Sequence, residues 1–340
     1  MKKGWRVVVV IALVAGLAAA ACASDAVTIV DSAGRVVVVP QPVERIASAY
    51  GIGTYYVYAL GAGNRLVAAW YVGVKSLGQA PASLRAMEPR LDELFSVGDP
   101  NVEELAARGA DLVVADAAKH AAFAAQMQGI GVPTLLLAPE TTQGVVDTTL
   151  ALGTALGEEA AGRAAQFVSD FWRVFAASEA ATRDVPSGER PRVLFVGSSS
   201  LQVASGAMYQ TQLIEAAGGV SVSEDLVGGW NTVNLEQILV WNPDVVIIPP
   251  YGNVTVADLM TSADWRSVRA VQTGRVVRMP RVFAPMDTPL PESLLGVMWL
   301  SSVLYPERET FDVRAEAAAF YGTYYGYALS QAEADSFLTP

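Results

Sequence analysis

Hydrophobic and polar positions along the chain follow two alternating periods, which predicts alternating strands and helices. Short apolar runs such as Leu112–Ala115, Thr134–Leu137 and Val245–Pro249 have the length of buried strands. Between such runs, apolar residues recur every three or four positions, which is the spacing of an amphipathic helix. This alternation predicts an α/β fold in which helices cover mostly parallel sheets.

One motif occurs twice in the chain, 133 residues apart. Residues 101–114 read NVEELAARGADLVV, and residues 234–247 read NLEQILVWNPDVVI. In each copy an Asn at a helix N-cap position opens a helical stretch that leads into an apolar strand. The repeat predicts two related Rossmann-like lobes with a ligand-binding cleft between them. The residues matched at equal offsets are Asn101 with Asn234, Glu103 with Glu236, and Asp111 with Asp244.

The chain divides into two lobes and a helical connection. Residues 27–144 are predicted to form the N-terminal lobe, residues 145–189 the linking helices, and residues 190–340 a C-terminal lobe with closing helices. Within the connection, Glu158–Thr182 is long and amphipathic, so its apolar face either packs on the protein's own lobes or forms a coiled-coil or dimer contact. Residues 75–98 are predicted to be irregular because they hold prolines and several charges.

The first 23 residues have the pattern of a secretion signal. A basic start is followed by the apolar stretch Val7–Leu17 and by small residues, and the stretch is too short to span a membrane. Two interpretations of its end compete. The signal is cleaved before Ser24, or Cys22, the only cysteine, becomes a lipidated N-terminus. We therefore expect a periplasmic protein, or one held at the outer face of the cytoplasmic membrane through Cys22.

Charge and composition exclude several classes of function. Removing the three basic residues of the signal leaves 20 basic and 34 acidic residues, a net charge of −14, and no basic patch for nucleic acid is visible. The chain has no cysteine after Cys22, which excludes an internal disulfide and a thiolate metal site. His120 is the only histidine, so a metal site built from several imidazoles is excluded. We predict no metal site and no cofactor.

Several stretches, in order, resemble the periplasmic substrate-binding proteins of ABC importers for iron-siderophores, haem, cobalamin and related metal chelates. They are TIVDSAGRVVVVPQPVERIAS, the two copies of the repeat, DWRSVRAVQTGRVVRMP and PESLLGVMWLSSVLYPE. The resemblance implies two α/β lobes joined by one long helix. It also implies a monomer that delivers a metal chelate to a membrane permease and its ATPase. The matching positions Glu103 and Glu236 would dock on the permease, although acidic residues are also favoured in the first turn of any helix.

Ligands of doubly wound α/β domains collect at the carboxyl ends of the strands. That rule selects aromatic residues with polar tips, which suit a bulky chelate, although each of them could instead be a core residue. Arg281 is the candidate for an anionic group on the ligand, and His120 is either an axial metal ligand or a surface histidine. The predicted ligand-binding residues are Tyr50, Tyr71, His120, Trp230, Tyr251, Arg281, Phe283 and Asp287.

Three other functions compete with the chelate importer. A bare metal-ion receptor is disfavoured by the single histidine. A ligand sensor would use the same cleft to inform a signalling protein. A secreted enzyme would need a nucleophile, and Gly197–Ser200 superficially suggests a serine, but the Gly-x-Ser-x-Gly turn is missing. We therefore predict a binding protein and not an enzyme.

Overall fold

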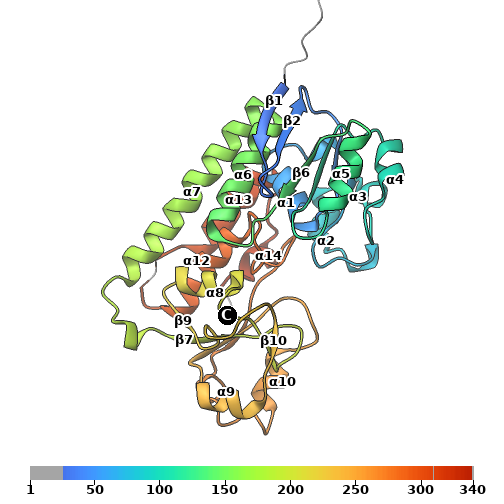
Figure 1. Cartoon of the computed structure of the whole chain (residues 1–340). Coiled ribbons are helices and arrows are strands. Elements are labelled where there is room, and N and C mark those ends of the chain that lie inside the picture. Colours follow the sequence, from blue (N-terminus) through green and yellow to red (C-terminus); the bar gives the residue numbers. More distant parts are fainter. Residues whose placement is uncertain (1–25, 309, 339–340) are drawn as a thin grey trace, which may run out of the picture.

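The computed structural model describes residues 26–308 and 310–338 (Figure 1). The predicted signal, Cys22 included, lies outside the described residues. Two α/β lobes, each with its own four-stranded parallel sheet, confirm the predicted fold class. The N-terminal lobe lies at the upper right of Figure 1 and the C-terminal lobe at the bottom.

The two sheets have the same strand order. The N-terminal sheet runs β4 (Leu66–Ala69), β3 (Ile46–Ser48), β5 (Leu112–Asp116), β6 (Thr134–Leu137). The C-terminal sheet runs β9 (Val220–Ser221), β7 (Arg192–Phe195), β11 (Val245–Ile248), β12 (Val276–Arg278). Numbered along the chain within its own lobe, each sheet has the order 2-1-3-4, and the repeat supplies the third strand of both. The repeat therefore marks equivalent units, one in each lobe.

The helices of the repeat, α4 (Val102–Ala107) and α9 (Leu235–Trp241), begin with the same cap. The Asn101 side chain accepts a hydrogen bond from the backbone N–H of Glu104, and Asn234 accepts one from Gln237, each at 2.9 Å. Each bond satisfies one of the N–H groups that a helix start leaves without an intrahelical partner. The repeated Asn is thus explained by local backbone chemistry.

The repeated Asp ties the third strand to the first strand of its sheet. Asp111 accepts hydrogen bonds from the backbone N–H groups of Glu44 and Arg45, at 2.9 and 3.0 Å. Asp244 accepts the equivalent bond from Arg192, at 2.9 Å. All three bonds lie at the amino edge of their sheet, so the repeated Asp makes equivalent contacts in both lobes.

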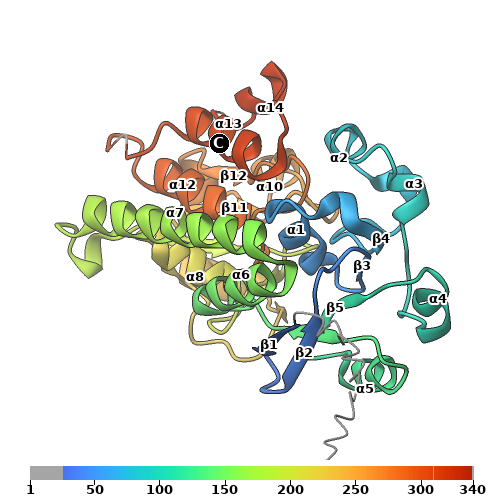
Figure 2. The ribbon, with the colours of Figure 1, turned by 90° about the horizontal axis from the view of Figure 1, so that it is seen from above.

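Helix α7 (Glu158–Thr182) joins the lobes and has the bounds that its periodicity predicts. Figure 1 shows it running along the left side from the hairpin end towards β7, and Figure 2 shows it beside α6 (Thr142–Leu156) and α12 (Ser293–Leu304). Its apolar face, with Phe167 and Phe171 fully buried, packs on these helices of the same chain. The prediction that this apolar face packs on the protein's own helices is therefore confirmed.

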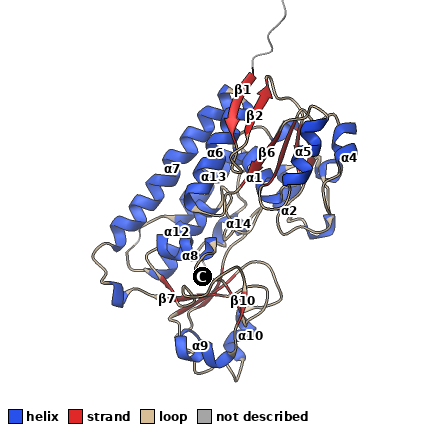
Figure 3. Cartoon of the chain, in the orientation of Figure 1, coloured by secondary structure: helices blue, strands red, loops and turns tan. Residues whose placement is uncertain are grey.

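The remaining elements surround this frame (Figure 3). Residues 75–98, predicted to be irregular, contain three short helices, and Pro81 is accommodated because it stands at the start of one of them, α2. Among the described residues, no helix has the length and apolar content needed to cross a membrane. The other elements are β1 (Ala26–Val30), β2 (Val36–Pro40), α1 (Gly51–Ala59), η1 (Gly63–Arg65), η2 (Leu77–Gln79), α2 (Ala82–Met87), α3 (Leu91–Leu94), α5 (Ala121–Gly129), η3 (Ser187–Glu189), β8 (Gln202–Val203), α8 (Tyr209–Ala216), β10 (Asn231–Thr232), α10 (Val256–Thr261), α11 (Arg269–Gln272), α13 (Val313–Tyr325) and α14 (Gln331–Asp335).

Candidate functional site

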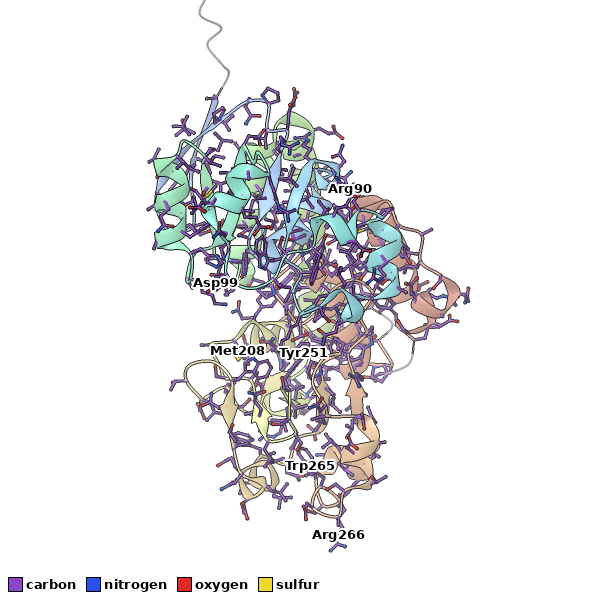
Figure 4. The ribbon with its side chains drawn as sticks, turned by 90° about the vertical axis from the view of Figure 1, so that its right-hand side faces the viewer. Arg90, Asp99, Met208, Tyr251, Trp265 and Arg266 are labelled. Carbon is purple, nitrogen blue, oxygen red and sulfur yellow. The ribbon has the colours of Figure 1, made fainter. Side chains whose placement is uncertain are left out.

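The boundary between the lobes is the candidate site. Figure 4 places Met208 and Tyr251 of the C-terminal lobe at this boundary, with Asp99 on the N-terminal lobe above them. The lobes touch directly at Gln212, whose side-chain oxygen accepts hydrogen bonds from the backbone and hydroxyl of Thr142, both at 3.0 Å. The Gln212 amide also donates to the carbonyl of Glu140 at 3.3 Å, so this contact lies beside the strand-end pair of Tyr50 and Glu140.

On the N-terminal side, Tyr50 is the second residue after β3 and is half-buried. Its hydroxyl donates a 2.8 Å hydrogen bond to the carboxylate of Glu140, which lies just after β6. Burial, and then the neighbouring Glu140, raise the pKa of Tyr50, so the hydroxyl stays protonated. The ring is thus held at the rim by a hydrogen bond between the ends of two strands.

On the C-terminal side, Tyr251 follows β11 and is also half-buried. Its hydroxyl donates a 2.5 Å hydrogen bond to Asp287, and the Gln210 amide donates a second one to the same oxygen at 2.9 Å. Asp287 is fully buried, and burial raises the pKa of its carboxyl group. Asp287 is therefore placed to orient Tyr251, and it has no surface for a ligand.

Trp230 is half-buried against Phe195, with 6.5 Å between the ring centroids. The Trp230 ring lies over Gly197, where an added Cβ would come within 2.9 Å of it. A glycine at this strand end therefore lets the large ring lie close to the backbone.

Arg281 follows β12 and is partly buried at the boundary. It lies close to the loop after β4 of the N-terminal lobe, where a Cβ added to Gly73 would be 4.0 Å from Nη2, and its Nε donates a 3.4 Å hydrogen bond to the carbonyl of Phe283. Within the described part of the chain, Nη2 has no hydrogen-bond partner and the guanidinium has no carboxylate within ion-pair distance. Burial lowers the pKa of Arg281, and the guanidinium still carries its charge near neutral pH. A half-buried, uncompensated cation of this kind attracts an anion.

Two predicted ligand-binding residues lie in the core. Tyr71 is 4% exposed and its hydroxyl pairs with that of Tyr58 at 2.8 Å. Phe283 is fully buried, and the rings of Tyr321, Tyr325 and Tyr327 surround it at 5.0–5.2 Å between centroids. Both residues follow strands as predicted, but their side chains turn into the packed interior. We do not include them in the site.

His120 is half-buried and is held within its own loop. Its Nδ1 accepts a hydrogen bond from the backbone N–H of Asp116 at 3.1 Å, and burial lowers its pKa. The neutral ring therefore carries its hydrogen on Nε2. A metal on Nε2 would need the hydrogen on Nδ1, which opposes the bond from Asp116. This geometry fits a structural histidine better than an axial ligand.

Ser198–Ser200 border a cavity of about 300 Å³. The Ser198 backbone N–H donates to the side chain of Gln202, and in the described structure no histidine lines this cavity. Across residues 26–308 and 310–338, no group of three or more His, Cys, Asp or Glu side chains is placed to hold a metal ion.

Several residues of the site were not predicted. Glu140 obeys the strand-end rule and could have been found with it. Gln210, Gln212 and Met208 lie at the start of α8, after a loop without periodic pattern, so no sequence signal pointed to them.

Glu103 and Glu236 are both exposed. At the other end of each helix, an arginine at the start of the first strand of the sheet donates a hydrogen bond to a helix-end carbonyl. Arg45 donates to the carbonyl of Arg108, and Arg192 donates to the carbonyl of Trp241. The helix ends are thus at the amino edges of the sheets, and each glutamate is at the opposite end of its helix. Figure 1 shows α4 on the outer flank of the N-terminal lobe and α9 at the end of the C-terminal lobe that lies away from the N-terminal lobe. In the described structure, the side chains of Glu103 and Glu236 make no hydrogen bond or ion pair with other residues of the chain.

The model of the family of periplasmic binding proteins matches residues 46–282, which include both sheets. The chain belongs to the periplasmic binding protein family. Its fold agrees with a periplasmic solute-binding protein of Veillonella parvula, with a TM-score of 0.80 and 23% identity over 92% of this chain and 97% of that one.

Two further proteins are similar in sequence to this periplasmic binding protein. The molybdate-binding protein MolA of Haemophilus influenzae is 28% identical over 144 residues, 42% of this chain and 41% of MolA. The match thus spans less than half of that relative. The Fe(3+)-citrate-binding protein YfmC of Bacillus subtilis is 24% identical over 217 residues, 60% of this chain and 67% of YfmC.

Proposed function

We propose that this protein is the extracytoplasmic substrate-binding component of an ABC importer and that its substrate is a metal chelate of low net charge that presents an anionic group. The observation that carries the proposal is the guanidinium of Arg281, whose Nη2 has no hydrogen-bond partner and which has no carboxylate within ion-pair distance among the described residues. Half-buried Tyr50, Trp230 and Tyr251 supply flat apolar area beside it. Two relatives are named for metal-containing anions, molybdate and Fe(3+)-citrate, which is consistent with a cation in the site.

The proposed role is binding and delivery, without catalysis. Arg281 would hold an anionic group of the chelate through parallel N–H bonds, and the aromatic rings would cover its apolar parts. Glu103 and Glu236, both exposed, would dock on basic residues of the permease. The permease and its ATPase are the proposed partners. The proposed location is the periplasm or, if Cys22 is lipidated, the outer face of the cytoplasmic membrane.

The experiment is a tryptophan-fluorescence titration of the mature protein. The probes are ferric citrate, molybdate, ferric hydroxamates, ferric catecholates, haem, cobalamin and bare metal ions. We expect saturable binding of at least one chelate that presents an anionic group. Arg281→Gln should weaken that binding about tenfold to a hundredfold, the range for a lost hydrogen bond to a charged group.

The matched control is Arg266→Gln, which removes an exposed arginine at the far end of the C-terminal lobe (Figure 4). It should leave the affinity unchanged. A response to bare ions alone would replace the proposal with a metal-ion receptor. If Arg281→Gln binds the chelate as tightly as the wild type does, the guanidinium does not contact the ligand. If the protein binds a chelate but its host has no permease and ATPase to receive it, the ligand-sensor interpretation is favoured.

A further inference from the structure

The two tyrosines at the boundary between the lobes, Tyr50 and Tyr251, each donate their only proton to a carboxylate. Tyr50 donates to Glu140 at 2.8 Å, and Tyr251 donates to Asp287 at 2.5 Å. Burial raises the pKa of both tyrosines, so both hydroxyls stay protonated. A phenol carries a single O–H, so an oxygen whose proton is already donated can only accept hydrogen bonds from a ligand. Both rings therefore suit a ligand that brings hydrogen-bond donors to them.

The two carboxylates differ in exposure, since Asp287 is fully buried and Glu140 is exposed. Tyr50 donates to Oε1 of Glu140, and no other residue of the described chain makes a hydrogen bond or an ion pair with this carboxylate. Asp116, the other carboxylate that acts on the Tyr50 hydroxyl, is paired with Lys119 at 3.5 Å. The charge that the described residues leave uncompensated at this rim is therefore that of Glu140.

This carboxylate and the guanidinium of Arg281 lie near the same loop, although they belong to different lobes. Directly after Tyr50, a Cβ added to Gly51 would lie 2.7 Å from the backbone nitrogen of Val72. One residue further along that loop, a Cβ added to Gly73 would lie 4.0 Å from Nη2 of Arg281. The carboxylate and the guanidinium are nevertheless not within ion-pair distance of each other. The site thus carries two separate charges of opposite sign, one from each lobe.

We propose that the substrate is a chelate that carries a cationic group, such as an ammonium, which binds Glu140, in addition to the anionic group that binds Arg281. This inference rests on the proposed function and narrows its substrate class. The ammonium donates hydrogen bonds to the Glu140 carboxylate and to the neighbouring Tyr50 oxygen, both of which can only accept them. A chelate that bears both charges satisfies both lobes and has a low net charge. A purely anionic complex, such as ferric citrate or molybdate, is attracted by Arg281 but repelled by Glu140.

The test compares two forms of one chelate by tryptophan-fluorescence titration: a ferric trihydroxamate with a free terminal ammonium, and the same molecule with that amine acetylated. We expect the wild type to bind the ammonium form about three- to tenfold more tightly, between the values for an exposed ion pair and for a buried hydrogen bond to a charge. Glu140→Gln keeps an oxygen for the Tyr50 hydroxyl but removes the charge, so the preference should disappear and ferric citrate should bind more tightly. Tyr50→Phe keeps the charge, so the preference should remain.

The matched control is Glu179→Gln, which removes an exposed glutamate near the end of α7, the helix along the left side of Figure 1. It should leave the affinities and the preference unchanged. A wild type that binds both forms equally, or a preference that survives in Glu140→Gln, overturns the inference. Equal binding of anionic chelates by the wild type and Glu140→Gln also overturns it. If Arg281→Gln still weakens binding in these cases, the proposed function stands. A protein that binds none of the chelates refutes the proposed function itself.

Discussion

The hydroxyl of Tyr251 donates a 2.5 Å hydrogen bond to the fully buried carboxylate of Asp287, 36 residues further along the chain. The bond fixes the orientation of a half-buried ring at the candidate site. Together with the bond from Gln210, it also places two donors against the same buried oxygen. Asp287, predicted as a ligand contact, is buried and orients the candidate contact residue Tyr251 through this bond.

Removing the Tyr251 hydroxyl should destabilise the fold. Tyr251→Phe leaves the buried Asp287 without its closest donor, which should lower the free energy of unfolding by about 1–3 kcal/mol. In the background of Asp287→Asn the same change should cost less, because the two residues share one interaction. Urea denaturation of the four proteins measures this coupling. Additive effects of the two changes would mean that the bond contributes nothing.

Stability should depend on pH through Glu292, which is fully buried at the start of α12. Burial raises its pKa to about 7 from 4.5, against the opposing hydrogen bond from Tyr325. The folded state therefore holds this proton more tightly than the unfolded chain does. The resulting stabilisation is fully present below pH 4.5 and is lost as pH rises through 7, on the order of 3 kcal/mol in total.

The control for this pH dependence is Glu292→Gln, which keeps the shape of the side chain and removes the titration. We expect the wild type to lose stability relative to Glu292→Gln between pH 4.5 and pH 8, as measured by chemical denaturation at each pH. The tyrosines around Glu292 do not titrate in this range, because burial raises the pKa values of Tyr55, Tyr321 and Tyr325 well above 10. A difference between the two proteins that is the same at every pH would contradict the assignment.

The repeat predicts matched costs in the two lobes. Asn101→Ala and Asn234→Ala each remove one helix cap, and each should cost about 1 kcal/mol. Thermal and urea unfolding of the single variants would check this. Serine at the same positions, which also caps helices, should restore most of the loss. A large cost in one lobe and none in the other would show that the equivalence is only geometric.

Removing both docking carboxylates should impair transport without weakening chelate binding. Glu103→Ala/Glu236→Ala changes two exposed residues with no hydrogen bond or ion pair to the rest of the described chain, so the fold should be unaffected. Uptake by the importer reconstituted in proteoliposomes measures the effect, with Glu104→Ala as a control on the same helix. Uptake at the wild-type rate would rule out a role for these carboxylates in docking.

Elements encoded by local pattern could be predicted from the sequence. The periodicity of Glu158–Thr182 gave the long helix, and the spacing of Asn, Glu and Asp revealed two equivalent lobes, because caps and helix faces depend on neighbouring residues. The two-residue strand β9 carries too short a pattern to be found, and it forms because β7 offers an edge to pair with. The helices within residues 75–98 were not predicted because they, too, are too short to show a periodic pattern.

The sequence by itself determined the fold class, the paired lobes and the strand ends from which the site is built. The tertiary structure alone decided which strand-end side chains face the boundary between the lobes. Tyr71 and Tyr50 have the same chemistry and both follow strands, yet one is stacked in the core and the other lies at the rim. Arg281 became the central residue because its Nη2 has no hydrogen-bond partner and no ion pair forms on it among the described residues. Burial and pairing of this kind depend on residues far apart in the chain, so no local pattern records them.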